Sequence, residues 1–188
     1  MLKPDYPILT ERLHLRPYTL DDFDALYDIH SRPEVARYLY WDARDPDEVR
    51  EALEKKIRSS MLADEGDALQ LAVVLPETGA LLGDVVLFWT SREHRQGEVG
   101  YIFHPDHGGR GYATEATAVM LRLGFEGLGL HRVVGRLDGR NAASARVLER
   151  LGLRREAHLV QNEMVKGEWT DEVIYAMLED EWRARRSG

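Results

Sequence analysis

The clearest absence in this 188-residue chain is cysteine, of which it has none. Without cysteine the protein cannot have a disulfide framework, a cysteine-ligated zinc site or a cysteine nucleophile. The chain also lacks any apolar run near the ~18 residues of a membrane-spanning helix, and its first residues lack the apolar core of a signal peptide. These absences lead us to expect a soluble cytoplasmic protein with no membrane partner.

Basic residues are fewer than acidic ones. Lysine and arginine total 25 against 33 for aspartate and glutamate, which gives a formal net charge of −8. An acidic chain is a poor candidate for nucleic-acid binding, which needs a basic face, and is better suited to a cationic or amine-bearing partner. With 44% apolar and 31% charged residues the composition is that of an ordinary globular protein, and the length corresponds to one domain over residues 1–188.

Hydrophobic periodicity predicts a mixed α+β protein with a central sheet. The expected strands are residues 13–17, 68–75, 80–89, 97–103 and 132–137, with two more between 155 and 177 that join near 166–167. The expected helices are residues 23–30, 46–61, 112–126 and 141–152. The charged end of the chain, residues 179–188, is expected to be frayed.

A glycine-rich loop, GGRG at residues 108–111, lies between an expected strand and the start of an expected helix. Glycine lets the backbone approach a ligand closely, and the first N–H groups of a helix have no partner within it. Together with the helix dipole they form an anion site, most often for phosphate, to which Arg110 can add charge. Tyr112 and Ala113 stand where a P-loop needs Lys and Ser or Thr, and the match to a dinucleotide fingerprint is imperfect. A turn that only caps the helix is the structural alternative.

Several segments, in order, resemble the GNAT superfamily of N-acetyltransferases. GGRGYA at residues 108–113 resembles the acetyl-coenzyme A signature Q/R-x-x-G-x-G/A of that superfamily. The others are EVGY at 98–101, NAAS at 141–144 and LERLGL at 148–153, while TERLHLR at 10–16 and GEWTD at 167–171 are similar to the RimJ/RimL-type branch, which acetylates protein N-termini and small amines. The resemblance covers nearly the whole chain. It implies a central mixed, mostly antiparallel sheet of about seven strands flanked by helices.

The resemblance also implies where the co-substrate acetyl-CoA binds, without a metal ion. Its pyrophosphate would lie on the backbone N–H groups of the loop and helix start, namely Gly108, Gly109, Arg110, Gly111, Tyr112, Ala113 and Thr114. A backbone N–H at the end of the preceding strand, assigned to Phe103, would face the thioester oxygen in an oxyanion-type role. Asn141 resembles the asparagine that binds the pantetheine arm or thioester region, and as a preferred N-cap residue it can serve the helix as well.

Amine acetylation from a thioester needs a neutral amine, a polarised carbonyl and a proton for the leaving thiolate. Because the chain has neither cysteine nor a G-x-S-x-G elbow, direct attack in a ternary complex is expected rather than a covalent acetyl-enzyme. Ser144 resembles the serine proposed to protonate the thiolate in RimL-like enzymes, although a serine in a helix usually has a structural role. Glu98 is the candidate base, with Asp84 as a weaker rival and a solvated or paired carboxylate as the alternative.

The acceptor side is less defined by the sequence. Tyr40 and Trp41, with Tyr38, lie between the first two expected helices, where the family places the walls of the acceptor site; a packing cluster is the alternative. Two positions depart from the family pattern. Gly108 stands where the family has Gln or Arg, and Leu148 stands where many members carry a tyrosine general acid.

The sequence leaves the acceptor open among a peptide N-terminus, a polyamine and an aminoglycoside-like amine, and it leaves a homodimer open as well. His104 and His107 are too few ligands to indicate a metal site. Two other functions stay open. One is a CoA-responsive sensor or partner-binding module of the same fold without turnover, which the two departures favour. The other is a nucleotide-binding enzyme.

Overall fold

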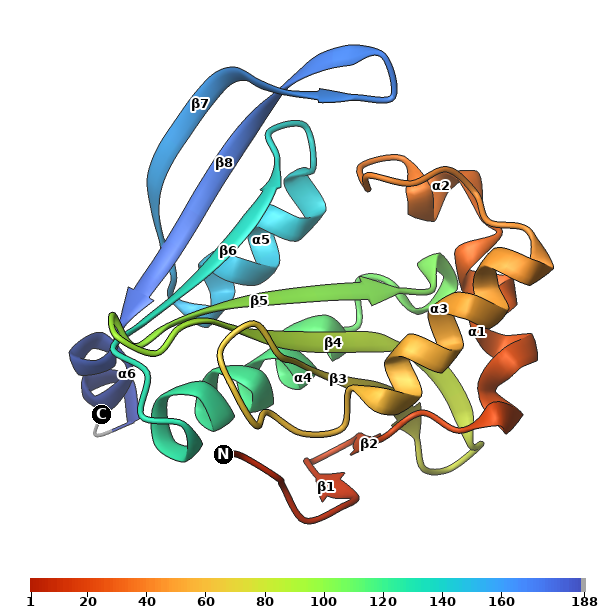
Figure 1. Ribbon diagram of the computed structural model, residues 1–188, viewed down its shortest axis with the longest axis horizontal. Helices are drawn as coiled ribbons and strands as arrows, with labels where there is room; N and C mark the ends of the chain where they lie inside the picture. Colours follow the sequence, from red (N-terminus) through yellow and green to blue (C-terminus); the bar gives the residue numbers. More distant parts are fainter. Residues whose placement is uncertain (187–188) are drawn as a thin grey trace.

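The computed structural model describes residues 1–186, which form one eight-stranded sheet in the order β1-β2-β3-β4-β5-β6-β8-β7 (Figure 1). The strands are β1 (Ile8–Leu9), β2 (His14–Arg16), β3 (Ala68–Leu75), β4 (Ala80–Ser91), β5 (Gln96–Phe103), β6 (Arg132–Asp138), β7 (Arg154–Val165) and β8 (Glu168–Leu178). Every neighbouring pair is antiparallel except β5 and β6, which are parallel. The predicted mixed, mostly antiparallel sheet is confirmed, and the short β1 is the strand that the periodicity did not predict.

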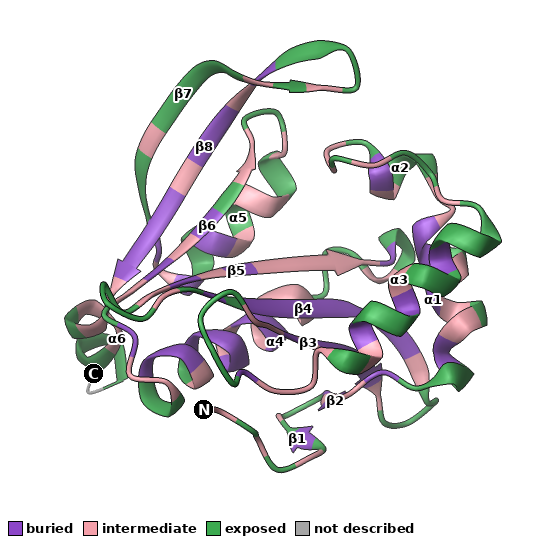
Figure 2. Cartoon of the chain, viewed as in Figure 1, coloured by how far each residue is buried: buried purple, intermediate pink, exposed green. Residues whose placement is uncertain are grey.

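Helices cover both faces of this sheet. They are α1 (Phe23–His30), α2 (Pro33–Ala36), α3 (Pro46–Arg58), α4 (Tyr112–Arg122), α5 (Ala142–Leu151) and α6 (Glu179–Arg186), with 3-10 turns at Leu20–Asp22 and Pro105–His107 and a π-helical turn at Leu123–Gly127. Along β3 the side chains alternate between two apolar cores: Leu71 and Val73 pack with α4 and α5, whereas Ala72 and Val74 pack with α1 and α3. The central strands are therefore buried on both faces, as Figure 2 shows for β4.

Two helix ends differ from the prediction. The helix expected over residues 46–61 ends at Arg58, because Ser59 leaves the helical region and Leu62 pairs with Leu2 as an isolated bridge. The helix expected over residues 112–126 is α-helical only to Arg122 and continues as the π-helical turn. Neither change alters the topology.

The parallel pair β5 and β6 separates along its length. The two strands are in register only through Gln96↔Arg132, Gly97↔Val133 and Glu98↔Val134, although β5 continues to Phe103 and β6 to Asp138. Figure 1 shows the two strands diverging from this point. The result is a wedge in the sheet, and α4 and α5 start near its open end.

The last two strands form the predicted hairpin. Lys166 and Gly167 both have positive φ (52° and 82°), as a two-residue turn of the mirror-image type requires. The distal part of this hairpin extends beyond the sheet and faces the segment around α2 (Figure 1).

The frayed C-terminal tail was a wrong prediction over residues 179–186, which form α6; residues 187–188 lie outside the described part of the chain. The Trp182 ring stacks on Phe125 at 5.6 Å, and its Nε1 donates to Glu126 at 2.8 Å. Arg95 pairs with Glu179 at 2.6 Å. These contacts join α6 to segments that are distant in the sequence. The charged composition of residues 179–188 alone cannot predict such contacts. Of the helices within residues 1–186, none is long and apolar enough to span a membrane.

Candidate active site

The open end of the wedge holds a cleft of about 410 Å³. Its walls are the end of β5, the glycine loop, the first turns of α4 and α5, and the segment around α2. The predicted site residues that line it are Phe103, Gly108, Gly109, Gly111, Tyr112, Ala113, Thr114, Asn141 and Ser144. Four other predicted residues, Glu98, Arg110, Tyr40 and Trp41, lie outside this lining.

The start of α4 provides free backbone donors at the cleft. Among residues 1–186 no acceptor bonds the N–H groups of Tyr112, Ala113 and Thr114, and the helix has no side-chain cap. Gly111 precedes them in the left-handed conformation (φ 80°), which residues with a Cβ rarely adopt. Unpaired N–H groups at the positive end of a helix dipole attract an anion. This arrangement fits the diphosphate of a nucleotide-type cofactor.

Arg12 braces the glycine loop from outside the cleft. Its NH1 donates to the Arg110 carbonyl oxygen at 2.9 Å, and its Nε donates to Glu115 of α4 at 2.7 Å. Thr10 Oγ1 also donates to Glu115, at 2.6 Å. The Arg110 side chain itself is exposed, so its predicted contribution of charge to the anion stays a prediction. Sequence reasoning singled out the segment around residues 10–16 but assigned Arg12 no role.

The start of α5 joins three polar groups. Asn141 Oδ1 accepts from the Ser144 N–H at 3.0 Å, so Asn141 is the N-cap, a role compatible with binding a cofactor. Ser144 Oγ donates to the Tyr101 hydroxyl at 2.9 Å, and that hydroxyl donates to the Ser144 carbonyl oxygen at 2.8 Å. Tyr101 was not predicted as a site residue. The signal for it is the alternation along β5, which places Tyr101 on the same face as Phe103.

Glu98 lies on the opposite face of β5 from Tyr101, because successive side chains of a strand alternate. Its Oε2 lies 3.4 Å from Nε of Arg136, and Arg136 also contacts Glu172 at 3.2 Å. Burial raises the pKa of Glu98; Arg136 opposes this effect and the nearby Glu172 carboxylate adds to it. A carboxylate with a raised pKa is a stronger base, so the partly paired Glu98 is still suited to accept a proton.

Asp84, the weaker candidate for the base, is held in the interior by three donors. Lys56 Nζ lies 2.7 Å away, and the Tyr18 hydroxyl and Gln70 Nε2 each donate at 2.9 Å. Burial opposes ionisation of Asp84, but Lys56 and Gln70 hold its pKa below the ordinary value. Because its carboxylate is buried and paired in this way, we interpret Asp84 as a structural residue and not as the base.

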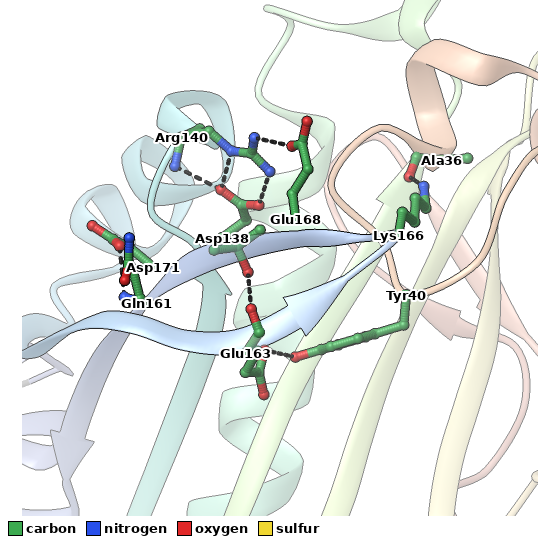
Figure 3. Close-up of polar contacts among 10 residues, drawn as sticks. Ala36, Tyr40, Asp138, Arg140, Gln161, Glu163, Lys166, Glu168 and Asp171 are labelled. Carbon is green, nitrogen blue, oxygen red and sulfur yellow. Dashed lines mark hydrogen bonds and ion pairs between the residues drawn. The ribbon is translucent and has the colours of Figure 1, made fainter.

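Tyr40 connects the loop after α2 to the β7–β8 hairpin. Its hydroxyl donates to Glu163 Oε2 at 2.6 Å, and Lys166 Nζ donates to the Ala36 carbonyl oxygen at 2.7 Å (Figure 3). We call this pair of contacts the strap. Partial desolvation of the hydroxyl raises the pKa of Tyr40, although the residue as a whole is exposed, and the carboxylates of Glu163, Glu172 and Glu98 raise it further. Three carboxylates thus lie near the Tyr40 hydroxyl, and two of them, Glu98 and Glu172, share the guanidinium of Arg136.

Trp41 does not share the surroundings of Tyr40. Its ring lies 4.9 Å from that of His30, and the guanidinium of Arg44 lies 4.1 Å from its centroid. These three residues line a second cavity of about 390 Å³ beside α3. Whether Tyr40 or Trp41 contacts an acceptor stays a prediction.

Comparison with known proteins identifies the family. The family profile described as "Acetyltransferase (GNAT) domain" matches residues 12–154. The chain belongs to this family. The N-acetyltransferase YnaD of Bacillus subtilis, described as uncharacterized, is 32% identical over 176 residues, covering 93% of this chain and 98% of YnaD. A GNAT-family acetyltransferase structure from Bacillus anthracis is 29% identical, with a TM-score of 0.83 over 92% of this chain and 98% of that one.

A more distant relative has a named substrate. A spermidine N-acetyltransferase from Vibrio cholerae, solved in complex with CoA and spermine, shares the fold with a TM-score of 0.77 and 23% identity, covering 93% of this chain and 99% of that one. The GNAT fold predicted from the sequence is therefore confirmed. The roles of the individual site residues stay predictions.

Two remaining features of this GNAT chain bear on its chemistry. Leu148 is buried against Gly135 in the core, so α5 supplies an apolar contact where many members carry a tyrosine.

His104 Nε2 lies 2.9 Å from Asp28, and its Nδ1 accepts from the Asp106 N–H, which engages both ring nitrogens within the protein. Among residues 1–186 no three His, Asp or Glu side chains are grouped to hold a metal ion.

Proposed function

We propose that the protein transfers the acetyl group of acetyl-CoA to a primary amine by direct attack in a ternary complex. The observation that carries this proposal is the row of unpaired N–H groups at the start of α4, beside a cleft at the open end of the wedge. Membership of the GNAT family supports it. The cofactor would supply an activated acetyl thioester, and the chain supplies binding and proton transfer.

On the cofactor side, the N–H groups of Tyr112, Ala113 and Thr114 would hold the diphosphate. Asn141 at the start of α5 would bind the pantetheine arm, and the backbone N–H of Phe103 would polarise the thioester oxygen. Holding both reactants in one cleft supplies much of the rate acceleration, up to about 7–11 kcal/mol in ideal cases.

On the acceptor side, Glu98 would remove a proton from the amine, directly or through water. The neutral amine nitrogen that results bonds to the carbonyl carbon and loses a second proton to water, the carbon–sulfur bond breaks, and its electron pair leaves on the sulfur. Ser144, the residue expected to assist the leaving thiolate, would donate a hydrogen bond to the sulfur. Attack from the Glu98 face and departure on the Ser144 face place the two roles on opposite sides of β5.

We infer a small polycationic amine as the acceptor. The carboxylates of Glu98, Glu163 and Glu172 near Tyr40 outnumber the one guanidinium, Arg136, that Glu98 and Glu172 share, and the whole chain carries a formal charge of −8. The spermidine N(1)-acetyltransferase of Vibrio cholerae, 24% identical over 87% of this chain and 91% of that protein, supports the same class. A peptide N-terminus is the competing acceptor, because the RimJ/RimL-type branch acetylates such termini.

Thiol release from acetyl-CoA, measured with spermidine, an unblocked peptide and an aminoglycoside, tests the proposal. We expect turnover with the polyamine and little with the singly charged peptide. Binding of CoA without turnover across the panel would favour the sensor alternative. Stabilisation by NAD or ATP but not by CoA would favour a nucleotide-binding enzyme.

A further inference from the structure

Tyr101 and Ser144 form a closed pair of hydrogen bonds at the cleft. The Tyr101 hydroxyl donates to the Ser144 carbonyl oxygen at 2.8 Å and accepts from Ser144 Oγ at 2.9 Å. The two residues come from different elements, β5 and α5, and both line the cleft. No other tyrosine or threonine hydroxyl of the cleft bonds to Ser144 within residues 1–186.

We propose that Tyr101 is a positioning residue for acetyl transfer, acting through Ser144, a role that rests on the proposed function. In the resting enzyme the pair fixes Ser144 Oγ at the cleft. As the carbon–sulfur bond breaks, the Ser144 hydroxyl rotates and donates its hydrogen bond to the sulfur instead of to Tyr101. The Tyr101 hydroxyl then donates its hydrogen bond to Ser144 Oγ instead of to the Ser144 carbonyl oxygen. Because both acceptors belong to Ser144, the Tyr101 ring need not move.

Whether Tyr101 gives up its proton or only a hydrogen bond depends on whether its phenol or the thiol of CoA is the stronger acid. Burial raises the pKa of the Tyr101 phenol to about 12. A thiol with an ordinary pKa of about 8.5 is a stronger acid than such a phenol. Tyr101 therefore keeps its proton, the electron pair of the broken bond stays on the sulfur, and the thiolate takes its proton from water after release. Of the two protons that the ammonium group loses, one goes to Glu98 and the other to water, so charge balances.

One turn after Ser144, α5 supplies no hydroxyl. Leu148 holds that position, and it is buried in the core. The hydroxyl-bearing ring beside Ser144 is instead supplied by β5. A chained pair of hydroxyls also makes Ser144 a stronger donor, because hydrogen bonds in a chain polarise one another.

Single-turnover acetyl transfer by the Tyr101→Phe variant tests the proposal. We expect the variant to bind CoA as the wild type does and to transfer acetyl from acetyl-CoA about fivefold to tenfold more slowly, the loss typical of one hydrogen bond. With the acetyl ester of the selenium analogue of CoA, whose selenolate leaves without assistance, the two proteins should react at equal rates. A merely structural role would slow both esters equally.

Two further variants complete the test. Tyr175→Phe is the matched control, because Tyr175 also donates to α5, at Glu149, but lies outside the cleft lining, so its rates should equal those of the wild type. In a Ser144→Ala background, adding Tyr101→Phe should cause no further loss. An additive loss, an equal loss with both esters, or an unchanged rate overturns the role of Tyr101. Absence of turnover by the wild type with every amine overturns the proposed function itself.

Discussion

At the scale of single residues, the proposed chemistry is divided between the two faces of β5. Glu98 lies on one face of β5, and Tyr101, three residues on, contacts Ser144 on the other. In the proposed mechanism, alternation along one strand separates the group that would take a proton from the groups that would stabilise the leaving sulfur. The wedge between β5 and β6 would allow one acetyl group to meet both.

Replacing Glu98 by Gln tests the base. Because only the ionised carboxylate accepts a proton, kcat/KM of the wild type should fall as the pH drops through the raised pKa of Glu98. Glu98→Gln should lose about 10²-fold in kcat/KM for the amine and lose this acid limb. Affinity for acetyl-CoA, measured by calorimetry, is the control. An acid limb that survives in the variant would assign the base to another group.

His30 predicts how stability depends on pH. Burial, with the charges of Lys56 and Arg44, lowers its pKa from 6.5 to about 4, against the opposing effect of Asp84. Between these pH values the unfolded chain binds more protons than the folded one, so the free energy of unfolding should fall as the pH drops from 6.5 to 4, by up to ~3 kcal/mol.

Urea unfolding at several pH values measures this dependence. His30→Gln should be less stable at neutral pH but flatter in its pH profile. His94→Gln, at an exposed turn between β4 and β5, is the matched control and should keep the wild-type slope. The same slope in both variants would assign the effect to another group.

At the scale of elements, the proposed cofactor binding depends on the start of α4. Gly111→Val forces a β-branched residue into a left-handed conformation, with its Cβ 3.5 Å from NH2 of Arg12, and so strains the loop that leads into the unpaired N–H groups. We expect CoA affinity to fall at least about tenfold, the equivalent of roughly 1.4 kcal/mol. Gly79→Val is the control, because Gly79 has a similar φ of 72° in the distant β3–β4 turn. CoA affinity near normal in Gly111→Val would contradict the site.

The strap should affect the acceptor and not the cofactor. Tyr40→Phe removes the 2.6 Å hydrogen bond to Glu163, which joins the loop after α2 to the hairpin. A bond to a charged acceptor contributes about 1.5–3 kcal/mol when buried, but Tyr40 is 72% exposed, so we expect only a few-fold rise in KM for the amine. Tyr27→Phe in α1 serves as the control. An equal change in KM for acetyl-CoA would contradict this role.

At the scale of the whole molecule, the excess of acidic residues should attract a cationic acceptor. Raising the salt concentration from about 0.05 M to about 0.5 M shortens the screening length severalfold. With a formal charge of −8, KM for spermidine should therefore rise with salt. A neutral amine such as an amino sugar measured well above its pKa should show little change. Equal salt dependence for both would argue against electrostatic recognition.

The topology from β2 to β8 could be predicted because its signals are local: alternation for strands, 3.6-residue periodicity for helices, and turn residues between them. Apart from the short α2, the elements that were missed depend on distant partners. β1 forms only by pairing with β2, and α6 is held by Phe125, Glu126 and Arg95. Their sequences are too short or too charged to carry a hydrophobic pattern of their own.

The sequence by itself predicted an anion site at residues 108–114, because a glycine-rich loop leads directly into a helix whose first N–H groups have no partner within the helix. The structure leaves the helix start without a side-chain cap, and anion binding there stays a prediction. Only the tertiary structure decided which side chains meet. Tyr101 reaches Ser144 across 43 residues of chain, Tyr40 reaches Glu163 across 123, and Asp84 is withdrawn into a buried pair with Lys56. Such contacts follow from the packing of helices on a sheet and from where its strands part, and no short stretch of sequence specifies either.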